Sequence, residues 1–106
     1  TEDEAVEAAA MLASRIAEVA DRGWFPVERN SVLNETEFID TDGSVYRPDR
    51  VVFDSGRVTV IDYKFGEHSP RYIRQVKKYA DIWKRMGYDD VSAVLWYVDS
   101  GVVMTA

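Results

Sequence analysis

Two runs rich in Val, Ile, Tyr and Phe, at residues 46–53 and 57–64, predict a pair of β-strands. The residues between them, Asp-Ser-Gly at 54–56, are typical of a tight turn. The two runs are therefore expected to pair as one antiparallel hairpin.

The register of this hairpin decides which polar side chains meet. If the turn is centred on its Ser-Gly pair, Val51 faces Val60 and Asp49 faces Asp62. Side chains alternate along a strand, so Lys64 shares the face of Asp62. A turn with an odd number of residues would instead put Asp49 on the opposite face, because a shift of one residue reverses every side chain.

The rest of the chain supplies further elements around the hairpin. Amphipathic patterns predict helices, and short apolar runs bounded by turn residues predict strands. The helices are expected at 3–21 and 69–87, and the other strands at 31–39, 91–98 and 102–105, with turns at 41–44 and 99–101. The order αβββαββ predicts one domain, residues 1–106, of α/β or α+β class, with helices against a mixed sheet.

The second helix has two contrasting faces. Ser69 is the expected N-cap, with Pro70 in the first turn. Gln75 falls within the apolar face, where its amide needs a partner; it either bonds a backbone group or orients a water or phosphate at a site. The opposite face gathers six basic residues, namely Arg71, Arg74, Lys77, Lys78, Lys84 and Arg85. Such a run is either a solvated surface or a stripe that follows a nucleic-acid backbone.

Composition narrows the function classes. The 106 residues contain 19 acidic and 13 basic residues, a net charge of −6, so the basic helix face is a local feature. The absence of cysteine excludes thiolate catalysis, disulfides and cysteine-ligated zinc, and it fits a reducing cytoplasm. No apolar run is long enough to span a bilayer, so we expect a soluble protein.

The opposed acids suggest a metal site. Like charges placed directly across a ribbon are destabilising unless something offsets them, and a divalent cation would do so. Carboxylates without thiolate or histidine partners prefer hard cations, so Mg²⁺ or Mn²⁺ is expected at Asp49 and Asp62. Lys64 beside them would position the attacking water and stabilise charge developing on a phosphate.

These residues carry a resemblance to a known family. Pro48-Asp49 followed by Asp62-Tyr63-Lys64 resembles the PD-(D/E)XK nuclease signature. The run Asp-Tyr-Lys-Phe-Gly at 62–66, and the spacing of Tyr72, Gln75 and Tyr79, resemble the C-terminal nuclease domain of RecB/AddA-type helicase-nucleases, over roughly residues 33–98.

This resemblance implies a restriction-endonuclease-like fold and a Mg²⁺- or Mn²⁺-dependent DNA exonuclease acting in DNA repair and recombination. It implies that Asp49, Asp62, Lys64 and Gln75 are catalytic and that the backbone carbonyl of Tyr63 is a further metal ligand. The expected nucleic-acid contacts are Tyr79, which belongs to the family's helix motif, and three residues of the basic helix face. These three are Arg71, Arg74 and Lys78.

The chain departs from the family pattern in one respect. RecB/AddA-type domains have a further ligand, usually a histidine, on an upstream helix, whereas the only histidine here is His68. The chain also begins at Thr1, so we expect a C-terminal fragment of a longer protein with attached helicase domains, inactive by itself. His68 is expected to be solvated, and Glu35 and Glu37 either supply a third ligand or lie at an exposed strand edge.

Two other classes remain open. One is a nuclease-fold module that has lost activity and binds DNA or a protein partner. The other is an acidic interaction domain in which Asp49 and Asp62 are chance surface acids and Arg47 and Arg50 form surface ion pairs, each worth under about 1 kcal/mol.

Overall fold

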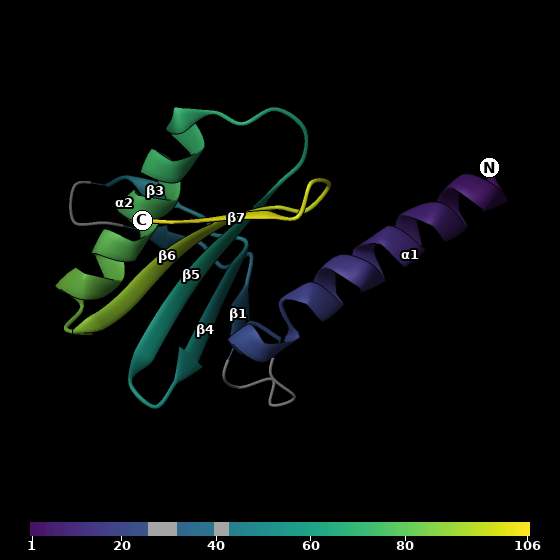
Figure 1. The fold of residues 1–106 in the computed structure, drawn as a ribbon. Coiled ribbons are helices and arrows are strands. Elements are labelled where there is room, and N and C mark those ends of the chain that lie inside the picture. Colours follow the sequence, from purple (N-terminus) through teal and green to yellow (C-terminus); the bar gives the residue numbers. More distant parts are fainter. Residues whose placement is uncertain (26–31, 40–42) are drawn as a thin grey trace.

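The computed structural model describes residues 1–25, 32–39 and 43–106 as a mixed α/β structure (Figure 1). A five-stranded sheet has the order β1-β4-β5-β6-β7, and β2 and β3 form a separate two-stranded ribbon. The helices are α1 (Glu2–Glu18), the 3-10 turn η1 (Ala20–Arg22) and α2 (Pro70–Arg85). The strands are β1 (Val32–Asn34), β2 (Phe38–Ile39), β3 (Val45–Tyr46), β4 (Arg50–Asp54), β5 (Arg57–Lys64), β6 (Asp90–Tyr97) and β7 (Val102–Thr105).

The predicted register of the central hairpin is confirmed. Strands β4 and β5 are antiparallel, and Val51 pairs with Val60. The turn uses Ser55 and Gly56, whose φ angles of 51° and 86° are both left-handed. Two left-handed residues match the twist of the flanking strands, so the connection has two residues and the parity of the register follows.

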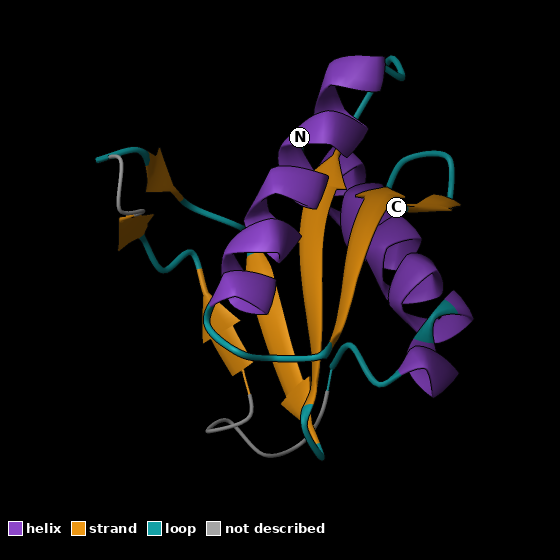
Figure 2. Ribbon diagram, turned by 90° about the vertical axis from the view of Figure 1, so that its left-hand side faces the viewer, coloured by secondary structure: helices purple, strands orange, loops and turns teal. Residues whose placement is uncertain are grey.

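Buried side chains cover both faces of the sheet, and α2 packs against one of them (Figure 2). Strand β5 continues through α2 into β6, which pairs with it in parallel, so the helix is the crossover that covers one face. The buried cluster on that face contains Val51, Val58, Val60, Val76, Tyr79, Ala80, Trp83, Ala93, Leu95 and Tyr97. The cluster on the other face contains Val19, Trp24, Val52, Ile61, Val94, Trp96 and Val98.

Two predicted strands are interrupted. The strand expected at 31–39 divides into β1, which pairs with β4, and β2, which pairs with β3. Glu35 between them has a φ of 49°, a left-handed conformation that ends an extended strand. The strand expected at 46–53 divides at residues 47–49, where Pro48 has no N–H for a ladder. Ser31 and the first two residues of the turn predicted at 41–44 lie outside the described residues.

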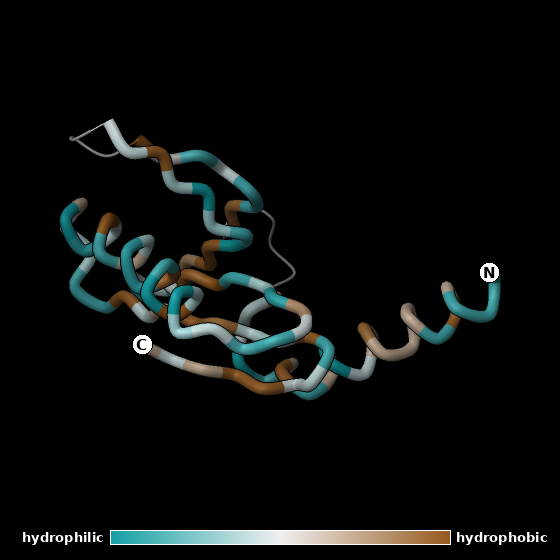
Figure 3. Tube along the Cα trace, turned by 90° about the horizontal axis from the view of Figure 1, so that it is seen from above, coloured by the Kyte–Doolittle hydropathy of each residue, from teal (hydrophilic) through white to brown (hydrophobic). Residues whose placement is uncertain are grey.

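The second long helix, α2, begins with the predicted N-cap, whereas α1 begins at Glu2, one residue before the predicted start. The Ser69 side chain accepts a hydrogen bond from the Arg71 N–H, and Gly87, with a φ of 107°, follows the end of α2. Thr1 and Glu4 form a capping box at the start of α1. That helix has no buried residue and extends away from the sheet (Figures 1 and 3). It ends at Glu18, before the predicted end at residue 21, and η1 then covers Ala20–Arg22. No helix in the described ranges is long and apolar enough to cross a membrane.

Leu95 and Met104, paired across β6 and β7, provide a test of the core. Leu95 is fully buried, whereas Met104 is 39% exposed. We expect Leu95→Ala to lower the free energy of unfolding by about 2–5 kcal/mol, because it removes buried apolar surface and leaves a cavity. Met104→Ala should cost under about 1 kcal/mol by urea denaturation; equal losses would contradict the assigned core.

Candidate functional site: an acid pair beside a basic cleft

The two predicted acids lie together where β4 begins and β5 nears its end. Asp49 directly precedes β4, and its N–H donates to Oδ1 of Asp62 at 3.0 Å. In return, Oδ2 of Asp49 accepts a hydrogen bond from the N–H of Tyr63 at 2.8 Å. Each carboxylate is therefore held by the backbone of the opposite segment, replacing the strand ladder at the point where Pro48 interrupts it.

Asp62 is buried in an unfavourable setting for a charge. Only 4% of the residue is exposed. The pKa of its carboxyl is raised to about 6 in all: burial is the largest cause and the charge of Asp49 adds to it, while the Asp49 N–H and Lys64 act in the opposite direction. The site thus holds two like charges whose repulsion and desolvation are only partly offset by Lys64.

This donor set fits a hard divalent cation. Oδ1 of Asp49 and Oδ2 of Asp62 accept no hydrogen bond from the described residues, so one oxygen of each carboxylate is available as a ligand. The carbonyl of Tyr63 lies in the same stretch of β5. Within residues 1–25, 32–39 and 43–106, however, no three His, Asp or Glu side chains form a group that could hold a metal. In the described chain, the acidic side chains that come together here are therefore Asp49 and Asp62 alone.

Lys64 is held beside the acids by an aromatic ring of α2. Its Nζ lies 4.7 Å from the centre of the Tyr72 ring, and the guanidinium carbon of Arg71 lies 5.5 Å from the same ring. A cation over an aromatic face is attracted by the ring quadrupole. Tyr72 thereby brings two positive side chains to one place.

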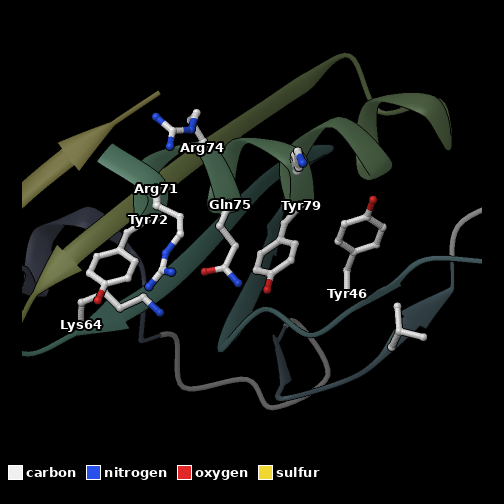
Figure 4. A pocket seen from close by; sticks show the side chains of 9 residues that line it. Tyr46, Lys64, Arg71, Tyr72, Arg74, Gln75 and Tyr79 are labelled. Atoms are coloured by element: carbon white, nitrogen blue, oxygen red, sulfur yellow. The ribbon is translucent and has the colours of Figure 1, made fainter. Parts of the chain in front are cut away.

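The side chains of Lys64 and Arg71 line a cleft of about 630 Å³ between α2 and β3 (Figure 4). Four basic and three tyrosine side chains line it, together with one amide and one aliphatic side chain: Lys64, Arg71, Arg74, Lys78, Tyr46, Tyr72, Tyr79, Gln75 and Val45. In the described part of the chain, none of the four basic residues forms an ion pair. The predicted basic stripe is therefore partly a cleft lining that includes Lys64.

Gln75 and Tyr79 occupy the middle of the cleft. The expectation that Gln75 lies within the buried face was wrong, because its side chain is exposed and hydrogen-bonds the Tyr79 hydroxyl. Burial and the charges of Asp62 and Asp49 raise the pKa of Tyr79. Tyr79 therefore connects the cleft electrostatically to the acid pair, and its ring packs edge-on against Tyr46 at 5.7 Å.

Three other predicted candidates lie away from this arrangement. Glu35 and Glu37 are exposed and outside any strand, and Glu35 pairs with Arg47 at 3.8 Å. His68 is exposed, as expected, but its ring stacks on Tyr97 at 3.7 Å.

Sequence reasoning missed two residues. Tyr46 lines the cleft from β3; an aromatic residue shortly before the Pro-Asp motif was the available signal. Arg50 forms no ion pair within the described chain and instead binds a backbone carbonyl behind the sheet, which no sequence pattern indicates. No protein-family model matches this sequence, and a search of curated proteins finds no relative of it.

The raised pKa of Asp62 predicts a pH dependence of stability in the metal-free protein. The folded state binds this proton more tightly than the unfolded state, whose carboxyl titrates near 3.8, so stability falls as pH rises from about 4 to 6. Each pKa unit corresponds to about 1.4 kcal/mol, so the effect is about 3 kcal/mol. The free energy of unfolding of Asp62→Asn, measured relative to wild type, should therefore rise by this amount between pH 4 and pH 7.

Urea denaturation in a chelator, at several pH values, measures this difference. The control is Asp89→Asn, which replaces an exposed acid after α2. Its free energy of unfolding should differ from that of wild type by the same amount at every pH. If the difference between Asp62→Asn and wild type were also independent of pH, the raised pKa of the wild-type Asp62 carboxyl would be refuted.

Proposed function

We propose that this chain is a PD-(D/E)XK-type nuclease domain that hydrolyses DNA phosphodiester bonds with Mg²⁺ or Mn²⁺. The observation that carries the proposal is the pair formed by the buried Asp62 and the half-buried Asp49, each with one uncommitted oxygen, beside a cleft lined by basic side chains. An acid pair of this kind weakens the fold unless a cation joins it, and a basic cleft suits a polyanion.

Each residue then has a distinct task. Asp49, Asp62 and the Tyr63 carbonyl would hold the ion, which lowers the pKa of a water and offsets charge on a phosphate oxygen. Lys64, held over Tyr72, would orient the attacking water and stabilise the growing negative charge. Gln75, which lines the cleft and hydrogen-bonds Tyr79, would orient a phosphate or a water.

The cleft would hold the DNA strand. Arg71, Arg74 and Lys78 supply phosphate contacts, and the tyrosine rings supply surfaces on which bases stack. The net charge of −6 opposes tight binding by the domain alone. We therefore place the domain in a RecB/AddA-like helicase-nuclease of DNA repair and recombination, whose attached helicase domains deliver the strand.

A second candidate is a module of the same fold that binds DNA, or a protein, without cleaving. The cleft favours it, because basic and tyrosine side chains bind a phosphate backbone without any metal. Such a module would keep its DNA affinity and show no change when the acids are replaced.

Calorimetry with Mn²⁺ and cleavage of single-stranded DNA with Mg²⁺ test the proposed site. We expect Asp49→Asn and Asp62→Asn to weaken Mn²⁺ binding at least about 10-fold, because each removes a charged ligand. Lys64→Ala should keep Mn²⁺ affinity within about 3-fold but reduce cleavage about 100-fold, because it removes charge stabilisation in the transition state.

Cleavage is measured on this chain and on a version extended upstream through the predicted further helix. Lys84→Ala, an exposed lysine of α2 that does not line the cleft, is the control and should behave as wild type. Equal rates for wild type, Asp62→Asn and Lys64→Ala in the extended protein would remove the assigned site.

DNA binding without metal tests the cleft separately. We expect Arg74→Ala and Lys78→Ala each to weaken binding of single-stranded DNA and to reduce the slope of log K against log salt by about 0.7, the value for one lost phosphate contact. Lys77→Ala is matched to them, being exposed on the same helix but outside the cleft lining. A similar change for all three would assign binding to the general charge of α2.

A further inference from the structure

Arg50 makes several contacts on the face of the sheet opposite the acids. Its Nε donates to the Trp24 carbonyl at 2.6 Å, and its Nη1 donates to Oδ1 of Asn34 at 2.9 Å. The guanidinium carbon lies 4.6 Å from the centre of the Phe25 ring. One side chain thus joins the start of β4 to β1 and to the connector after η1.

The same guanidinium reaches β5. Burial raises the pKa of Tyr63, whereas the charge of Arg50 and a hydrogen bond with it lower that pKa. The Tyr63 ring also packs edge-on against Trp96, with centroids 5.9 Å apart. The side chain of Tyr63 is therefore held from behind the sheet, at the residue whose N–H binds Asp49.

Arg50 follows Asp49 in the chain, so its position constrains the backbone at Asp49. Asp49 lies before β4 and Pro48 supplies no N–H, so the ladder between β4 and β5 does not extend to the Asp49 backbone. The Asp49 carbonyl accepts a hydrogen bond from the Glu35 N–H at 3.1 Å, and the Asp49 N–H donates to the Asp62 carboxylate. Arg50 is itself the residue after Asp49, and its side chain hydrogen-bonds that of Tyr63, so it links the two segments that carry the acid pair.

We propose that Arg50 is a positioning residue that fixes the distance between the segments carrying Asp49 and Asp62-Tyr63. Its role in metal binding rests on the proposed nuclease function; its role in holding the segments does not. The guanidinium is suited to this task because its planar fork presents several donors in fixed directions, which a lysine ammonium does not reproduce.

A purely structural role predicts a different result. If Arg50 only completes the packing around Trp24 and Phe25, its loss weakens the whole sheet evenly. If it positions the acids, the effect is concentrated at the N–H groups of Asp49 and Tyr63, which donate to the two carboxylates. Amide hydrogen exchange separates local opening from global unfolding residue by residue.

The test compares Arg50→Lys with Arg57→Lys in the metal-free chain. Arg57 lies at the other end of β5, exposed and paired with Asp90 at 3.0 Å, so it is a matched control. We expect Arg50→Lys to accelerate exchange at Asp49 and Tyr63 about 10-fold or more, with Val52 and Val60 unchanged, and Arg57→Lys to leave all four amides unchanged. Tyr63→Phe, which removes the hydroxyl contact alone, should show a smaller effect at the same two amides.

Mn²⁺ calorimetry gives the second measurement. Residues that orient metal ligands typically change affinity by about 10–100-fold, so Arg50→Lys should weaken Mn²⁺ binding by about 10-fold and Arg57→Lys should not. Even acceleration at all four amides, or none at Asp49 and Tyr63, would overturn the positioning role. Wild-type protein that binds no Mn²⁺ would overturn the proposed function instead, and the exchange pattern would still decide the role of Arg50.

Discussion

The candidate site depends on the reciprocal hydrogen bonds between the Asp49 segment and the Asp62–Tyr63 segment. The Asp49 N–H binds the Asp62 carboxylate, and the Tyr63 N–H binds the Asp49 carboxylate. Backbone donors stabilise a carboxylate without neutralising it, so the two charges are held close together and remain like charges. Burial of Asp62 then makes the ionised arrangement costly, which raises the pKa of its carboxyl, and the proposed cation would offset the same cost.

Burial of the sheet on both faces explains how this geometry is maintained. Because side chains alternate along β5, Asp62 and Lys64 face α2 while Tyr63 faces the Trp24 and Trp96 cluster. The chemistry and its support therefore lie on opposite sides of one strand. Arg50 belongs to the supporting side, where its half-buried side chain finds fixed acceptors in a carbonyl and an amide oxygen.

The distribution of charge separates this site from the rest of the molecule. The chain is acidic overall, yet Lys64 and three basic residues of α2 line one cleft without ion pairs in the described chain. Tyr72 draws Lys64 and Arg71 together against their mutual repulsion. Under the proposed function, a phosphate held together with a divalent ion would match both the positive cleft and the neighbouring acid pair.

Local sequence determined the hairpin register, the cap of α2 and the shared face of Asp62 and Lys64, because turn geometry and strand alternation depend on near neighbours. Tertiary structure decided the breaks at Glu35 and Pro48, the exposure of Gln75 and the contacts of Arg50. These features depend on residues distant in the chain: exposure depends on which elements cover a helix face, and a long side chain takes whichever acceptors the packing brings near. The acids were therefore predictable from the sequence alone, whereas the groups that hold them were visible only in three dimensions.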